Sequence, residues 1–329
     1  MKRSLPLLLA LALTISSCDK RDELDASIAG IAVANPDFSV LEDAAVRGGL
    51  VGTLTEKNRN DPSGNFTVFA PNNAAFARLG LRSASDLLVL QQPFLTQTLL
   101  YHTSNGSLVG DYLTPGTTAP SLLGPPRRFI TRNNVLYVNG SRVLATDIKA
   151  ANGTVHAIDK VMLATGADIV QSALALQTSK VFVQPELTYL VEALVYCDLV
   201  PALTASTGSP SFTVYAPTDA AFKNLFRALS TPTMTLETPA DIRKLSKATV
   251  TNILLNHVVA DGGRFTSELP ENTSVASLGG PAQPVRIGPF TDGTLTLRGV
   301  NNTIPANMVI PDILCTNGVV HLIDQVLLP

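Results

Sequence analysis

The chain has 329 residues, of which 45% are hydrophobic and 15% charged, and its formal net charge is −2. This length is too great for one ordinary domain and fits two of about 150 residues, and the apolar content argues against disorder. Without a cluster of basic residues the chain is not expected to bind nucleic acid, because displacing counterions from phosphates requires a concentrated cationic face.

The amino-terminal segment is typical of export and membrane attachment. Lys2 and Arg3 precede the apolar run LPLLLALALTI, which is too short to span a bilayer. The following ISSC resembles a bacterial lipobox, which implies a signal peptide over residues 1–17 and lipidation of Cys18. A charged tether is predicted over residues 18–25, and the alternative is a secretory leader with an incidental cysteine. Lipidation would anchor the protein in the cell envelope, with the outer membrane favoured and the face left open.

The next segments predict helices and a strand in quick succession. PDFSVLEDAAVRGGL, residues 36–50, predicts a helix that ends at Gly48 and Gly49. FTVFAPNNAAFARL, residues 66–79, begins with β-branched and aromatic residues that favour a strand. Pro71 stops this strand, and the asparagines after it are residues that open a helix by accepting hydrogen bonds from free amides.

A hairpin and a final strand are predicted later in the first half. VLYVNGSRV, residues 135–143, reads as two strands around an Asn-Gly turn. NGTVHAIDKVML, residues 152–163, follows it as a strand. Strict alternation fails here, because His156 would share a strand face with Ile158 and Val155 with Asp159, so a bulge or a change of face is predicted near the aspartate.

The second half repeats the first. FTVYAPTDAAFKNL at 212–225 agrees with the earlier phrase at nine of fourteen positions, and NGVVHLIDQVLL at 317–328 agrees at eight of twelve. The segment 163–181 between the copies is apolar enough to be helical, so the second copy is expected to begin at once and to touch the first. PELTYLVEALVYCDL then predicts a helix, with Pro185 in its first turn and five residues at apolar helical spacing: Leu187, Leu190, Val191, Leu194 and Val195. A period this long indicates two tandem domains.

These paired phrases resemble the fasciclin-type (FAS1) domain: a strand–Ala-Pro–Asn/Thr–x–Ala-Phe segment, an intervening histidine and an H-x-I-D-x-V strand. The resemblance covers residues 26–164 and again 167–329. It implies an α+β fold with two tandem domains, each a wedge of mostly antiparallel strands packed with several helices. Members of this family are mostly secreted or membrane-tethered adhesion and matrix proteins.

The four histidines occupy matched positions in the copies, His102 with His257 and His156 with His321. The first pair lies on apolar helical faces, where a histidine is more often a hydrogen-bonded core residue than a ligand. Each copy offers two histidines, whereas zinc requires three or four converging ligands, so neither a metal nor another cofactor is expected.

Two acids, a tyrosine and two cysteines complete the candidate residues. Asp159 and Asp324 are predicted to tie the last strand of each copy, together with its histidine, to a neighbouring loop, and a binding role is the alternative. Tyr101–His102 matches a tyrosine–histidine pair that the resemblance links to integrin contact in animal members. The second copy departs from it with Asn256–His257, and the alternative is that Tyr101 packs its ring and satisfies its hydroxyl locally. Two further cysteines are predicted to be free and buried, with a disulfide left open: Cys197 and Cys315.

The sequence contains no nucleophile elbow, zinc-protease or phosphate-loop motif, so no catalytic activity is expected. The favoured function is a lipid-anchored envelope protein for adhesion or matrix interaction, attached to the membrane at Cys18, with a protein or polysaccharide surface as its partner. The alternative is a glycan- or small-ligand-binding lipoprotein accessory to an uptake system. A deep polar pocket between the domains would favour that alternative.

Overall fold

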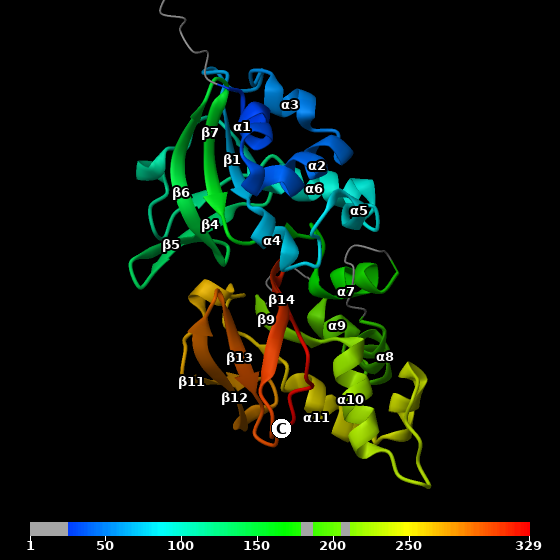
Figure 1. Cartoon of the computed structure of the whole chain (residues 1–329). Coiled ribbons are helices and arrows are strands. Elements are labelled where there is room, and N and C mark those ends of the chain that lie inside the picture. Colours follow the sequence, from blue (N-terminus) through cyan, green and yellow to red (C-terminus); the bar gives the residue numbers. More distant parts are fainter. Residues whose placement is uncertain (1–25, 179–186, 205–210) are drawn as a thin grey trace, which may run out of the picture.

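The computed structural model describes residues 26–178, 187–204 and 211–329. The predicted signal peptide, Cys18 and the charged tether lie outside the described residues, as does Pro185. In Figure 1 two similar halves are stacked end to end, and in each half the helices lie on the same side of the sheet. None of the described helices is long and apolar enough to cross a membrane.

In the first half the helices come early and most strands late. The elements are α1 (Ile28–Ala34), η1 (Pro36–Phe38), α2 (Ser39–Arg47), α3 (Val51–Thr55), β1 (Phe66–Pro71), α4 (Asn73–Ala77), α5 (Ala84–Leu87), α6 (Gln92–His102), β2 (Thr103–Asn105), η2 (Gly110–Tyr112), β3 (Thr118–Ala119), β4 (Arg127–Arg132), β5 (Val135–Val138), β6 (Ser141–Ala150) and β7 (Gly153–Ile158).

The second half follows the same order after the short connecting strand β8. Its elements are β8 (Leu163–Ala164), α7 (Ile169–Thr178), α8 (Thr188–Tyr196), α9 (Val200–Leu203), β9 (Phe212–Pro217), α10 (Asp219–Leu229), η3 (Pro239–Lys244), α11 (Lys247–Leu255), β10 (Val258–Val259), η4 (Thr266–Glu268), β11 (Thr273–Ser277), β12 (Gly280–Thr291), β13 (Thr294–Arg298), β14 (Ala306–Cys315) and β15 (Gly318–Ile323).

Both sheets share one strand order. In the first half it is β2-β1-β7-β6-β5-β4-β3, and in the second it is β10-β9-β15-β14-β13-β12-β11. The first strand of each half pairs in parallel with the last, β1 with β7 and β9 with β15, while the other pairs along these paths are antiparallel. The predicted α+β fold, two tandem wedges of mostly antiparallel strands packed with helices, is confirmed.

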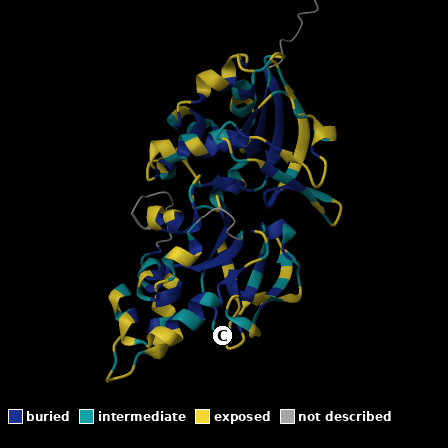
Figure 2. Ribbon diagram, turned by 180° about the vertical axis from the view of Figure 1, so that it is seen from behind, coloured by how far each residue is buried: buried dark blue, intermediate teal, exposed yellow. Residues whose placement is uncertain are grey.

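The central parallel strands are buried on both faces. All six residues of β1 and all six of β7 are buried, and Figure 2 shows these strands dark blue between more exposed outer layers. In β1, Val68 packs into the helical core while its neighbour Phe69 packs into a separate cluster on the other face of the sheet. A Cβ added at Gly153 would lie 2.0 Å from the carbonyl oxygen of Phe66, so this close crossing of β7 and β1 requires glycine.

The predicted turns and caps are confirmed. The Asn72 side chain accepts a hydrogen bond from the Ala75 amide at 2.9 Å, and Thr218 caps α10 in the same way. The helix α2 ends before Gly48 and Gly49, and Gly49 has a φ of 72°. Asn139 and Gly140 both have positive φ at the tip of the β5–β6 hairpin.

Three details differ from the sequence-based expectation. A bulge does lie beside Asp159, but in the neighbouring strand β6: the register shifts flank Ala145, and the first is opposite Ile158. The extra residues are in β6 because β7 pairs on both of its edges and β6 is the more exposed strand. Val195 is 48% exposed and does not face the core. The helix α11 ends at Leu255, so His257 lies just beyond the helix.

The two halves contact each other, as expected. The connecting strand β8 pairs in parallel with β14. The ammonium group of Lys160 crosses into the second half, where it donates to Thr266 Oγ1 at 2.9 Å and lies 2.7 Å from Asp312 Oδ2. The side chains of this ion pair are only 7% and 5% exposed. The second half has Gln325 where the first has Lys160, so this contact arises from a difference between the repeats.

Arginines of β4 extend the contact. The guanidinium of Arg128 lies 4.7 Å from the ring centroid of Phe265, and that of Arg132 lies 4.1 Å from the centroid of Phe290. Arg132 also donates to the carbonyl oxygen of Leu269 at 2.7 Å. The halves are therefore joined by paired cations and aromatic rings as well as by the chain itself.

We expect Lys160→Gln to lower the free energy of unfolding by about 3 kcal/mol, because the carboxylate of Asp312 would stay buried without its cation. Denaturant unfolding of the full chain measures this. The matched control is Arg78→Ala, which breaks an interdomain ion pair at 2.8 Å whose partner Asp292 is 77% exposed; this change should lower stability by less than about 1 kcal/mol. Equal effects of the two substitutions would contradict the assignment.

Candidate partner-binding site

His102 is held entirely by backbone groups. Its Nδ1 donates to the carbonyl oxygen of Thr98 at 2.7 Å, one turn earlier in α6. Its Nε2 accepts a hydrogen bond from the Met162 amide at 2.9 Å. Because a nitrogen that accepts carries no proton, this ring is neutral, and burial lowers its pKa to about 4. His102 therefore links α6 to the segment after β7.

His257 repeats this arrangement in the second half. Its Nδ1 donates to the carbonyl oxygen of Ile253 at 2.8 Å, and its Nε2 accepts from the Leu327 amide at 2.8 Å. Burial again lowers the pKa to about 4. The hydrogen bond to the residue four positions earlier places the ring as if the helix continued, although α11 ends at Leu255.

The second histidine pair bridges strands. The Asp147 amide donates to His156 Nδ1 at 3.2 Å, and the Asp312 amide donates to His321 Nδ1 at 3.1 Å. Both Nε2 atoms donate to a loop carbonyl oxygen, and burial lowers both pKa values. His156 stacks on Phe69, with 5.1 Å between ring centroids, and so lies on the face of β1 opposite to the helical core.

The matched aspartates tie neighbouring strands together. Asp159 Oδ1 accepts from the Arg142 amide at 2.7 Å, and Asp324 Oδ1 accepts from the Asn307 amide at 2.7 Å. In each half the partner belongs to the adjacent strand, β6 or β14, and not to a loop, since the aspartate follows directly after β7 or β15 and lies opposite the start of its antiparallel neighbour.

Tyr101 is fully buried. Its hydroxyl donates to the Pro126 carbonyl oxygen at 3.4 Å and accepts from the side-chain amide of Asn139. Burial raises the pKa of its hydroxyl. Beside it the buried Arg127 donates to the Tyr101 carbonyl oxygen at 3.2 Å. A partner cannot touch this ring unless the domain opens.

At the position of Tyr101 the second half has Asn256, which is also fully buried. Asn256 accepts from Ser277 Oγ at 3.0 Å and donates to the Leu327 carbonyl oxygen at 3.4 Å. The two residues thus fill corresponding interior positions with different hydrogen bonds. The cysteines Cys197 and Cys315 are free and buried.

Two asparagines that the sequence did not single out fix the position of the first helix. Asn152 Oδ1 accepts from the Ile28 amide at 2.9 Å, and Asn317 Oδ1 accepts from the Ile169 amide at 2.9 Å. Asn152 also donates to the Leu54 carbonyl oxygen at 3.0 Å. The sequence does mark these asparagines, because each is the first residue of its copy of the second repeated phrase, NGTVHAIDKVML or NGVVHLIDQVLL. They hold the opening helix of each half against the end of the sheet.

A cavity of about 290 Å³ lies between the halves. Glycines, prolines and strand residues line much of it, and Arg128 is its charged lining residue. That guanidinium already donates to the Gly263 carbonyl oxygen and to Glu268 Oε2, both at 2.8 Å. Across the described ranges no group of three or more His, Cys, Asp or Glu side chains is arranged to hold a metal ion.

These contacts define a tandem pair of α+β domains in which the recurring polar residues hold the fold together. The chain belongs to the fasciclin domain family: the model of the Fasciclin domain matches residues 36–164 and 185–329.

The relatives include animal and bacterial proteins. Human periostin is 29% identical over 292 residues, which cover 85% of this chain and 31% of periostin. The transforming growth factor-beta-induced protein ig-h3 of Oryctolagus cuniculus is 30% identical over 280 residues, covering 84% of this chain and 36% of ig-h3. The chain thus spans about a third of the length of these two relatives. The immunogenic protein MPB70 of Mycobacterium bovis is 34% identical over 147 residues, covering 41% of this chain and 68% of MPB70.

A solved structure of a FAS1 domain pair from the insect cell adhesion molecule fasciclin I is also similar. It matches with a TM-score of 0.37 and 17% identity, and the match covers 91% of this chain and 95% of that one.

We expect the stability of the protein to fall as the pH is lowered from 6.5 towards 4. His102 and His257 have pKa values of about 4 in the folded chain against an ordinary 6.5, so the unfolded chain binds more protons in this range and protonation favours unfolding. This contribution is fully present above pH 6.5 and is lost as the pH falls through about 4. It amounts to roughly 3 kcal/mol for each ring.

Denaturant unfolding at a series of pH values measures this dependence. His102→Gln should lower stability at neutral pH yet flatten the dependence between about pH 7 and 5, because one titrating group is gone. An unchanged slope in this variant would show that other groups carry the effect.

Proposed function

We propose that this protein is a lipid-anchored adhesion protein of the cell envelope without catalytic activity, and that it binds a protein or polysaccharide surface. Its membership of the fasciclin domain family supports this proposal. The observation that carries it is that the candidate histidines are occupied by contacts within the fold. Each of the four makes hydrogen bonds to backbone groups through both ring nitrogens. Recognition is then left to exposed side chains.

The exposed aromatic residue of the described chain is Tyr112, in η2 of the first domain, with 66% of its surface accessible. Its neighbour Gly110 donates its amide to Asp147 Oδ1 of β6 at 2.7 Å, which fixes the turn against the sheet. A rigidly presented tyrosine is a common anchor in protein interfaces because it offers a large contact area at little entropic cost. We therefore assign the contact to Tyr112 and not to Tyr101.

The alternative function, uptake of a small ligand or glycan, needs a polar pocket. The interdomain cavity of about 290 Å³ is its best support, but Arg128 there is already paired with Glu268. Adhesion through an exposed surface is favoured for this reason.

Cys18→Ala should release the protein from membranes, because the acyl chains that hold it would no longer be attached. Fractionation of cells that express the full chain measures this, with Cys197→Ala as the control that removes a different cysteine. If the Cys18 variant still sediments with membranes, the anchor is wrong.

Tyr112→Ala should weaken adhesion several-fold while changing the free energy of unfolding by no more than about 0.5 kcal/mol. The assay uses beads coated with the full mature chain carrying Cys18→Ser, and counts their attachment to intact cells of the bacterium that produces the protein. Tyr101→Phe is the matched comparison. It should lower stability by about 1 kcal/mol, because Asn139 loses its acceptor, and should leave attachment unchanged.

Loss of attachment with Tyr101→Phe but not with Tyr112→Ala would contradict the assignment. Attachment of the parent beads that is abolished by free monosaccharides would favour the ligand-binding alternative.

A further inference from the structure

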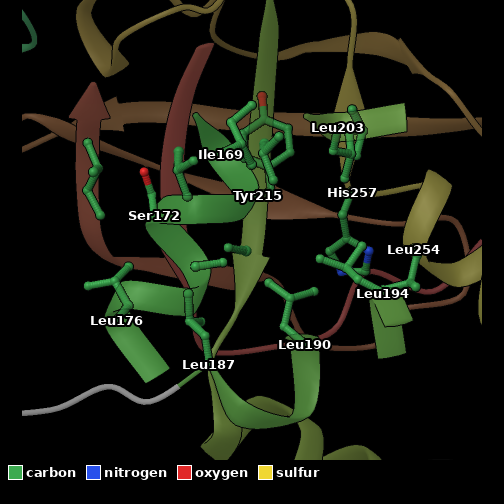
Figure 3. A pocket seen from close by; sticks show the side chains of 16 residues that line it. Ile169, Ser172, Leu176, Leu187, Leu190, Leu194, Leu203, Tyr215, Leu254 and His257 are labelled. Carbon is green, nitrogen blue, oxygen red and sulfur yellow. The ribbon is translucent and has the colours of Figure 1, made fainter. Parts of the chain in front are cut away.

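An apolar cavity occurs at the same place in both domains, between the opening helices and the first strand. In the second domain it measures about 30 Å³ (Figure 3), and in the first it measures about 90 Å³. Most of the lining residues occupy corresponding positions of the repeat. They include Ile28 and Ile169, Leu41 and Leu190, and His102 and His257.

The difference in size has a local cause. The register of α2 and α8 is fixed by equivalent contacts: Asn73 accepts from the Val40 amide at 3.0 Å, and Asp219 accepts from the Tyr189 amide at 3.0 Å. In this register Ala45 of the first domain corresponds to a leucine of the second.

That leucine is Leu194. Its side chain points into the cavity in Figure 3, beside Leu190 and His257. Ala45 has only a methyl group at this place, so the first domain keeps open the space that Leu194 fills in the second.

The larger cavity opens to solvent between exposed valines. Val33, Val46 and Val51 all line it, and they are 63%, 64% and 41% exposed. Exposed apolar side chains around an apolar cavity mark a binding site more often than an ordinary surface. The one charged residue in the lining is Glu42.

We propose that this cavity, which we call the α1–α3 groove, binds the acyl chain of a single-chain membrane lipid with a zwitterionic, ethanolamine-type head. The enclosed volume is smaller than the roughly 150 Å³ that holds a benzene ring, so a narrow aliphatic chain fits better than a ring. The rest of the chain lies across the three exposed valines. The carboxylate of Glu42 at the groove favours an ammonium head over a carboxylate.

The position of the groove in the chain supports a membrane lipid as the occupant. Ile28, which lines it, follows Cys18 by ten residues, and a fully extended chain of this length spans at most about 36 Å. The inference rests on the membrane attachment proposed above, which keeps the groove within this distance of the bilayer.

The test uses the full mature chain with Cys18→Ser and a lysophosphatidylethanolamine with a sixteen-carbon chain, below its critical micelle concentration. Calorimetric titration should give saturable binding of one lipid per protein. Ala45→Leu, which copies the second domain, should weaken binding at least tenfold with the melting temperature unchanged or raised. Val46→Asp, at the exposed mouth, should weaken it without affecting folding.

Val195→Asp is the matched control for Val46→Asp. Val195 occupies the corresponding position in the second domain and is 48% exposed, and the cavity there is only about 30 Å³ because Leu194 occupies part of the space. This variant should bind lipid as the parent chain does. Palmitate, which carries a carboxylate head, should bind more weakly than the lysolipid.

Absence of saturable binding to the parent chain would overturn the proposal, as would binding that survives both Ala45→Leu and Val46→Asp. Palmitate binding as tight as that of the lysolipid would overturn the assignment of the head group. Because the tested chain carries no lipid at residue 18, these outcomes are independent of whether Cys18 anchors the protein.

Discussion

The parallel pairing of the first and last strands of each domain constrains the structure around it. β1 and β7 lie side by side, as do β9 and β15, and all four strands are buried along their whole length. Parallel strands need a long crossover connection, and here the crossover contains most of the domain. The histidines and asparagines next to these strands then hold the crossover in place through backbone hydrogen bonds, which explains why they recur in both copies.

The two domains differ at the residues through which they contact each other. Asp147 is exposed in the first domain, whereas Asp312 at the matched position is buried against Lys160. The second domain has glutamine at the position of that lysine. The bulged strands β6 and β14 are equivalent in the two domains. The ion pair between Lys160 and Asp312 forms an interdomain joint at β14. Cation–π contacts of Arg128 and Arg132 broaden this joint beyond the single ion pair.

A comparable difference separates the helical faces. Ala45 leaves a groove in the first domain that Leu194 fills in the second. A lipid groove near the membrane and the exposed Tyr112 on η2 would give the first domain two separate surfaces, one for the bilayer and one for an external partner. The second domain would then stabilise and position the first through the joint.

The sequence by itself determined the duplication, the family, and those turns and helix caps that depend only on neighbouring residues. The caps at Asn72 and Thr218 and the hairpin at Asn139 depend on residues within a few positions of each other. It could not determine which face of the central strands was buried, because burial on both faces removes the alternating pattern. Only the tertiary structure decided where the histidine nitrogens bond, that Tyr101 is inaccessible, and that Lys160 crosses between domains. Each depends on groups that are far apart in the chain and are brought together by packing.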